Sequence, residues 1–192
     1  MVHTDSSILE LQGTFVDPIK ATSRIWNPNW LSPLEADHVE EYLDILAFCH
    51  ESSWIREDVE DLATSIIAIG DRMISTEEGI EASCLASYRE LRRTLQQNPK
   101  SQLNTDESPY EPFMRLLHTR RSYISTTGFV GLLPLHAKPG DVIYICLGSR
   151  TPYVLRAGED GYHTLVRETY VHGILYGQYM KKDPKIETIR LK

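Results

Sequence analysis

The sequence predicts an α+β fold, in which an N-terminal helical region of about four helices precedes a small antiparallel β unit. Apolar residues recur at the helical period of 3.6 through much of residues 32–97. From residue 120 onward, short runs rich in β-branched and aromatic residues alternate with turns that contain glycine. Residues 98–109 are polar and rich in turn formers, so we interpret them as a linker within the helical region 32–109.

The composition is that of a globular chain of about one domain. Of the 192 residues, 41% are hydrophobic and 24% are charged. The longest apolar runs are too short to span a bilayer, and the N-terminus lacks the pattern of a secretory signal. Cys49, Cys84 and Cys146 are far apart and form no CxxC pair, which favours reduced thiols. We therefore expect a cytoplasmic protein that has no membrane partner.

The net charge of −7 is unevenly distributed along the chain. Residues 35–81 hold 14 acidic side chains and two arginines, whereas residues 82–192 hold 16 basic and 10 acidic side chains. The acidic part fits a solvated helical face, although such a split also lets the two halves attract each other or orient a partner. Nucleic acids require a concentrated basic surface, so we expect no nucleic-acid partner.

The N-terminal part divides into an arm and helices. Residues 1–31 contain two prolines and several turn formers, which predict an irregular N-terminal arm. The capping pattern at residues 32–35 begins the first helix, and residues 55–67 carry the apolar stripe of the second. A third helix is expected over residues 75–98, and a short fourth helix over residues 110–118.

The β unit, which spans residues 110–180 together with the short helix, is expected to hold six strands. The runs are RSYIS, FVGLL, DVIYICL, PYVLRA, YHTLVRET and YVHGI. DVIYICL is apolar on both faces, which indicates the most buried strand. A short meander with a two-sided central strand tends to curl into a small barrel, which removes exposed edges. Residues 181–192 are interpreted as a basic tail.

No motif in the chain assigns a catalytic, cofactor-binding or metal-binding residue. The seven histidines form no metal-ligand spacing with cysteine, and HExxH, GxSxG and the phosphate-binding glycine loops are absent. The one thiol–imidazole pairing that the β unit permits joins Cys146 to His163 or His172. Because Cys146 lies in an apolar strand, where thiols are usually buried and inert, we expect no enzymatic activity and no cofactor.

His172 stands alone at the end of a strand, between Val171 and Gly173. A histidine there can bond a neighbouring strand through one ring nitrogen and pack its ring face. A lone histidine without partners does not make a site, so we interpret His172 as structural. Gly173 is expected to relieve crowding or to adopt a conformation that other residues avoid.

Several short motifs follow one another in the β unit in a distinctive order. Paired arginines precede an aromatic strand, and then come a glycine-containing strand, a Pro-Gly-Asp turn, a Pro-Tyr-Val-Leu-Arg strand and a closing Tyr-Val-His-Gly. In this order and spacing, residues 110–180 resemble the region downstream of the HET domain in fungal heterokaryon-incompatibility proteins. The motif positions are Arg121, Gly128, Gly131, Pro139, Gly140, Asp141, Pro152, Arg156, Tyr170, His172 and Gly173.

The resemblance implies a non-catalytic intracellular module that acts by protein contact in self/non-self recognition or its regulation. A full-length HET-domain protein is the partner that it implies. The chain departs from the family pattern at Tyr176 and Gln178, where acidic residues are common. The first 110 residues lack the strand-rich blocks of the HET domain, so the resemblance implies the accessory half without its effector.

Two other hypotheses stay open on the sequence alone. One is a small-ligand-binding or enzymatic domain whose pocket lies between the helices and the β unit. Its candidate polar groups are His136, Asp141, His163 and His172. The other is a truncated remnant that folds and has no activity. A ligand that binds only the native state would raise the melting temperature and thereby distinguish the two.

Overall fold

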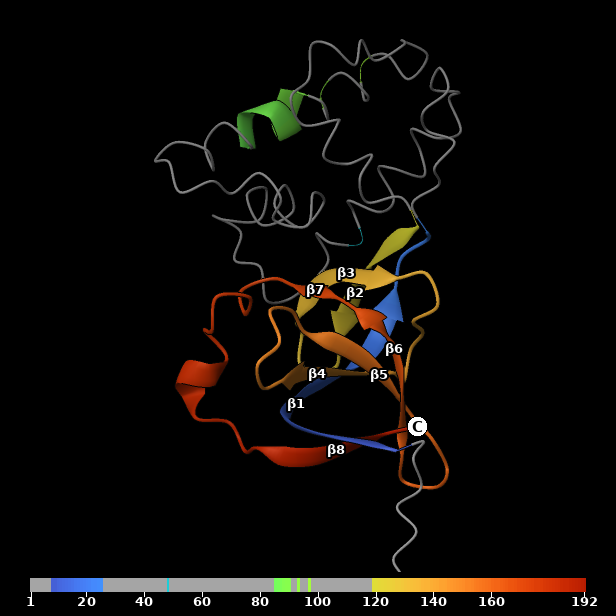
Figure 1. The fold of residues 1–192 in the computed structure, drawn as a ribbon. Helices are drawn as coiled ribbons and strands as arrows, with labels where there is room; N and C mark the ends of the chain where they lie inside the picture. Colours follow the sequence, from blue (N-terminus) through green and yellow to red (C-terminus); the bar gives the residue numbers. More distant parts are fainter. Residues whose placement is uncertain (1–7, 26–47, 49–84, 91–92, 94–96, 98–118) are drawn as a thin grey trace, which may run out of the picture.

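The computed structural model describes residues 8–25, 48, 85–90, 93, 97 and 119–192. Eight strands, all in one sheet, lie within these residues, together with a short 3-10 helix (Figure 1). The strands are β1 (Leu9–Thr22), β2 (Arg120–Ser125), β3 (Val130–Pro134), β4 (Val142–Cys146), β5 (Tyr153–Ala157), β6 (His163–Glu168), β7 (Tyr170–Val171) and β8 (Glu187–Leu191), and the 3-10 helix η2 spans Met180–Lys182.

The sheet closes on itself through five of its strands. Its order is β4-β5-β6-β8-β1-β2-β3-β7, and β1 also pairs with β4, so β4, β5, β6, β8 and β1 form a ring. The remaining strands extend from the second half of β1. In Figure 1, β1 runs from beside β8 at the bottom of the view up to β2. The predicted barrel-like closure is confirmed.

The six strands predicted between residues 121 and 174 are confirmed as β2 to β7, but they do not pair as a meander. β1 lies between β2 and β4, and β3 pairs with β2 and β7. β6 meets β8 in a parallel arrangement through a single pair, His163 with Leu191. The ring is therefore closed at the β6–β8 position by much less pairing than elsewhere.

The prediction of an irregular arm over residues 1–31 is wrong for Leu9–Thr22, which form the longest strand, β1. The register of β1 shifts on both sides of Pro18, where it passes from one half of the sheet to the other. Pro18 has no amide hydrogen, and its carbonyl accepts a hydrogen bond from the amide of Thr126 at 2.9 Å. The proline that indicates a break in the sequence thus lies at a bend within a strand.

The prediction of a basic tail over residues 181–192 is also wrong, because Glu187–Leu191 form strand β8. Five consecutive residues of β8 pair with β1, and Ile189 and Leu191 are buried. The alternation of polar and apolar residues in this segment indicates a strand, but its pairing partner lies at the other end of the described chain.

The α+β fold class is wrong, since the described chain is mostly β and contains no N-terminal region of four helices. Residues 85–90 are helical and lie within the predicted third helix, and Tyr88 on its apolar stripe is buried. The first two predicted helices, the linker and the helix at residues 110–118 fall almost entirely outside the described residues. No helix among the residues described is long and apolar enough to cross a membrane.

Strand β4 is buried on both faces, as its two-sided run predicts, and it separates two apolar clusters. Ile143 packs in a cluster with Leu133 and Val154. Tyr144 and Cys146 pack in the second cluster, which draws its other members from strands of the ring. The most buried strand is nevertheless β3, in which all five residues are buried.

Candidate functional site

A partly buried ion pair joins the Pro-Gly-Asp turn to strand β5. Asp141 is only 1% exposed and accepts two hydrogen bonds from Arg156, at 2.8 Å from Nε to Oδ1 and 2.8 Å from Nη2 to Oδ2. The amide of Lys138 also donates to Oδ2 of Asp141, at 2.9 Å, and Arg156 donates to the carbonyl of His136. The bond to Asp141 raises the pKa of the Arg156 guanidinium. We call Asp141 and Arg156 the clamp.

The backbone of the same turn is fixed to β1. Gly140 has a φ of 91°, a conformation that favours glycine, and its amide donates to the carbonyl of Ile19 at 2.9 Å. The amide of Ile19 in turn donates to the carbonyl of Asp141 at 2.8 Å. Pro139, directly before Gly140, has its own φ fixed by the proline ring. Three motif residues and Arg156 of β5 therefore hold one turn against two strands.

The two arginines at the start of β2 have different surroundings. Arg120 donates to Oε1 of Glu168 at 2.6 Å and to the carbonyl of the same residue at 2.8 Å. The Nε of Arg121 is buried and has no hydrogen-bond partner among the residues described. Burial lowers the pKa of Arg121, and the negative charge of Asp141 acts in the opposite direction. Of the two clamp residues, Asp141 is thus the one that acts electrostatically on Arg121.

The turn between β2 and β3 depends on Gly128 and on Asp17. Of these two residues, the sequence analysis identified Gly128 alone. Gly128 has a φ of 99°, and its amide donates to the carbonyl of Ser125 at 3.2 Å. Asp17 is 3% exposed and accepts hydrogen bonds from the amide and the hydroxyl of Thr127, at 2.6 and 2.9 Å. No local pattern indicates Asp17, because its partner lies 110 residues away.

Strand β3 approaches β7 so closely that position 131 has no room for a side chain. A Cβ at Gly131 would overlap the carbonyl oxygen of Tyr170. Next to this approach, the buried hydroxyl of Thr169 donates to the carbonyl of Leu132 at 2.8 Å, and its amide donates to the carbonyl of Pro152 at 2.9 Å. The motif residues Gly131, Pro152 and Tyr170 therefore meet where β7 docks.

His172 lies directly after β7. Its amide donates to the carbonyl of Val130 at 2.8 Å, and its Nδ1 lies 3.1 Å from the hydroxyl of Tyr170. Gly173, which follows, has a φ of 79°. Burial lowers the pKa of the His172 imidazole below its ordinary value. These contacts fix the end of β7, and the structural role of His172 stays a prediction.

The lowered pKa of His172 predicts a loss of stability in acid. As the pH falls below about 6.5, the unfolded chain takes up a proton at this residue before the folded chain does, so the free energy of unfolding decreases. Stability from this source is fully present above that pH. Chemical denaturation at about pH 7.5 and about pH 5.5 should show a smaller decrease for His172→Gln than for the unaltered protein. If the free energy of unfolding of His172→Gln decreased as much as that of the unaltered protein, the prediction would be contradicted. His136→Gln is the control for the removal of an imidazole.

A pocket of about 220 Å³ lies between the start of β3 and the segment that follows β7. The described residues that line it are Gly128, Phe129, Val130, His172, Gly173, Ile174, Gln178, Tyr179 and Lys182. The rings of Phe129 and Tyr179 meet edge to face, with centroids 6.1 Å apart. Nζ of Lys182 lies 5.9 Å from the centre of the Tyr179 ring. Aromatic and apolar walls are thus combined with an ammonium group.

The four polar groups expected in a ligand pocket are not brought together. His172 lines the pocket, whereas Asp141 belongs to the clamp and His136 is exposed in the turn before it. The ring of His163 contacts the edge of Tyr144 instead, with centroids 5.6 Å apart. The expected position of a pocket between the helices and the β unit involves residues outside those described.

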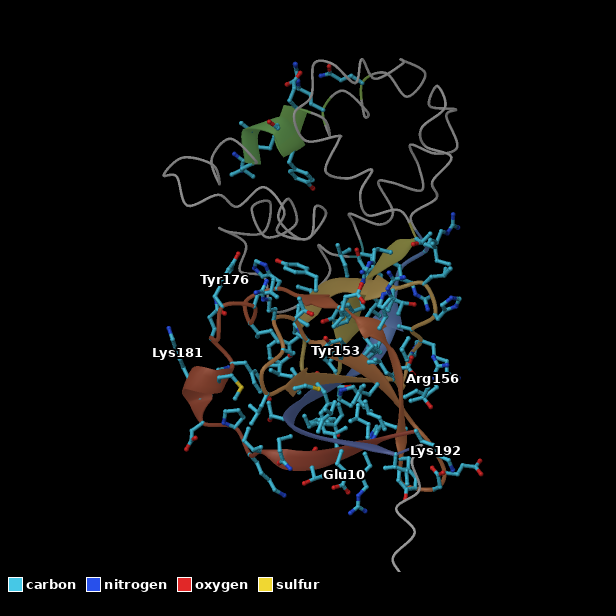
Figure 2. The ribbon with its side chains drawn as sticks, viewed as in Figure 1. Glu10, Tyr153, Arg156, Tyr176, Lys181 and Lys192 are labelled. Carbon is cyan, nitrogen blue, oxygen red and sulfur yellow. The ribbon has the colours of Figure 1, made fainter. Side chains whose placement is uncertain are left out.

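Figure 2 shows that Arg156 of the clamp lies apart from the segment that follows β7. Arg156 lies on one side of the view, whereas Tyr176 and Lys181 of the segment after β7 lie on the other, and Lys181 points away from the barrel. The motif residues therefore serve at least two places in the fold. Gly128, His172 and Gly173 line the pocket, and the Pro-Gly-Asp turn and Arg156 form the other group.

The interior of the ring holds several titratable groups. Burial raises the pKa of the Cys146 thiol, so the thiol is protonated at neutral pH. Burial and a hydrogen bond with Glu187 raise the pKa of Tyr144 to about 12. Nδ1 of His163 is buried without a hydrogen-bond partner in the described part of the chain. Across those same residues, no group of three or more histidine, cysteine or acidic side chains is placed to hold a metal ion.

The ordered motifs and the closed sheet agree with a match to a known protein family. Residues 19–188 match the model of the Het-6 beta-barrel domain. The chain belongs to this family. It is therefore a heterokaryon-incompatibility-related module, which agrees with the broader part of the motif resemblance. The family is named for a β-barrel, and the closed sheet of this chain fits that description. No curated protein and no solved structure matches the chain.

The family match reaches further along the chain than the motifs do. It begins within β1 and ends within β8, whereas the resemblance was assigned to residues 110–180. The two terminal strands that the sequence analysis missed thus lie at the ends of the matched segment. Lys182 of the pocket was missed for a related reason, because it lies in the segment interpreted as a basic tail.

Proposed function

We propose that the chain is a non-catalytic, cytoplasmic module that acts by protein contact in self/non-self recognition or its regulation. In this proposal it corresponds to the region downstream of the HET domain, and its partner is a HET-domain protein. The match of residues 19–188 to the Het-6 beta-barrel domain is the observation that supports the link to heterokaryon incompatibility.

The hydrogen bonds of the polar motif residues support a scaffold role. Asp141 and Arg156 bond to each other and to the turn, and Thr169 bonds to the backbone of β3. Polar groups that bond within the fold stabilise one backbone arrangement and are not available to a substrate. We infer that these residues set the shape of the barrel, while its surface supplies the contacts with a partner.

One edge of β6 offers a suitable surface. This strand pairs with β5 at five positions, but with β8 only at His163. Leu165 in the same strand is 48% exposed. Among the described residues, this edge of β6 has no strand partner beyond His163, and a strand edge of this kind with an exposed apolar side chain is suited to accept a strand from another protein. The proposal therefore assigns the contact to β6.

The proposal predicts that the purified chain binds a HET-domain protein from the same organism. Each such protein is expressed alone and titrated with the chain in a calorimeter. We expect saturable binding to at least one of them, with a Kd at or below about 10 µM. Leu165→Glu should weaken this binding about tenfold or more, because it places a charge within the apolar contact.

Leu147→Glu provides the matched control. Leu147 is 51% exposed and lies in the turn after β4, so the same change of side chain occurs away from β6. The affinity of this variant should stay within about twofold of the unaltered chain. If no HET-domain protein binds the folded chain, the proposed protein contact is wrong. Equal weakening by the two variants would exclude β6 as the contact surface.

A further inference from the structure

We propose that the pocket between β3 and the segment after β7 binds a small carboxylate that carries one apolar group, such as a single aromatic ring. This ligand site is independent of the protein contact assigned to β6. The pocket lies where three motif residues meet η2, and neither the family match nor the motifs assign it a ligand. Its volume, its walls and its charge each restrict the ligand.

The volume and the walls of the pocket select a small apolar group. About 220 Å³ is below the roughly 300 Å³ at which pockets for drug-sized ligands begin. Val130 and Ile174, both buried, contribute aliphatic surface, and Phe129 and Tyr179 contribute ring surface. A single ring can pack against such walls edge to face or offset, as aromatic side chains do with each other.

Lys182 supplies the charge that selects a carboxylate. Its ammonium group lies over the ring of Tyr179 and makes no ion pair within the described structure. No carboxylate stands among the described residues that line the pocket. Asp17 acts electrostatically on Tyr179, but its carboxylate is bonded to Thr127. Lys182 is exposed, so water solvates its charge, and an anion bound at the edge of the apolar pocket would form an ion pair with it.

His172 supplies a polar group that complements the ammonium group. When the hydroxyl of Tyr170 donates to Nδ1, the proton of the neutral ring is on Nε2, which can then donate to a ligand oxygen. Burial lowers the pKa of His172, so its ring is neutral at pH 7. The charge attraction therefore comes from Lys182, and His172 contributes orientation.

Phenylacetate is a suitable probe, because it joins one ring to one carboxylate. Titration followed by protein NMR should give saturable shifts of the Phe129, Ile174 and Tyr179 signals, with a Kd of the order of 1 mM. Lys182→Met retains most of the side-chain length and removes the charge. It should weaken binding about fivefold, the effect expected for a partly exposed ion pair. Phenylacetamide has the same shape and no charge. It should bind the unaltered protein about as weakly as phenylacetate binds Lys182→Met.

Lys181→Met is the matched control, since Lys181 neighbours Lys182 and does not line the pocket. This variant should bind phenylacetate as the unaltered chain does. Three results would overturn the proposal: shifts that do not saturate, shifts outside the pocket, or equal weakening by the two lysine variants. Benzylamine, which carries the opposite charge, should not bind, and binding as tight as that of phenylacetate would also contradict it. Thermal unfolding of each variant confirms that the chain is folded.

Discussion

Replacing Asp141 with alanine is expected to lower the free energy of unfolding by about 3 kcal/mol. The change removes the two hydrogen bonds from Arg156 and the one from the amide of Lys138. The Arg156 side chain is 38% exposed, so water replaces part of what it loses, and the estimate lies at the lower end for a broken buried pair. A domain is typically stable by about 5–15 kcal/mol, which makes this loss a large share.

Urea denaturation of the variant checks this prediction against a matched control. Asp160 forms an ion pair with Lys192 at 3.2 Å, but the two side chains are 49% and 55% exposed. Asp160→Ala should therefore change the stability little, because water solvates both groups when the pair is absent. Asp141→Asn keeps the shape of the side chain and should fall between the two. If Asp141→Ala were no more destabilising than Asp160→Ala, the clamp would not hold the turn.

The strands that the sequence predicts are those whose signals are local. β2 to β7 alternate with turns at Gly128, Gly140, Gly148 and Gly161, and in each of these glycines φ is positive. A turn of this kind is encoded by the residues that form it. The two-sided run of β4 is equally local, which is why its burial on both faces was predictable.

The strands at the two ends of the described chain depend on partners that no local pattern identifies. Glu10 of β1 pairs with Arg190 of β8, 180 residues away, and their side chains form an ion pair at 2.9 Å. Pro18 indicates a break when it is considered alone, and becomes part of a strand only when β2 and β4 flank it. The sequence analysis missed both strands because their pairing is long-range, whereas the periodicity of a sequence is a local signal.

The candidate site shows the same division. The motif resemblance identified residues that the fold uses, such as Asp141, Arg156 and Gly131, but not where they would lie relative to one another. The clamp and the pocket are different places, and the pocket takes its charge from Lys182, outside every motif. Spacing along the chain could not assign Lys182, because η2 follows β7 in the chain and β7 is placed by its long-range pairing with β3.

Gly131→Ala should destabilise the protein by about 3 kcal/mol or more. The added Cβ would overlap the carbonyl of Tyr170 and come within 2.9 Å of the Tyr123 ring, so β3 and β7 must separate. Tyr123 is only 1% exposed and has little room to yield. Separation would also break the hydrogen bond from the His172 amide to Val130. Urea denaturation gives the loss, and hydrogen exchange should show the His172 amide exchanging faster.

Gly148→Ala separates the effect of crowding from that of backbone strain. Gly148 has a φ of 83°, and a Cβ there would meet nothing within 4 Å. Its replacement should cost about 1 kcal/mol, the usual penalty for a side chain in the left-handed region. A loss at position 131 no greater than this would mean that β7 adjusts without cost. The larger expected loss would establish that β7 can approach β3 closely only because position 131 has no side chain. The placement of the segment that lines the pocket would then depend on Gly131 as well.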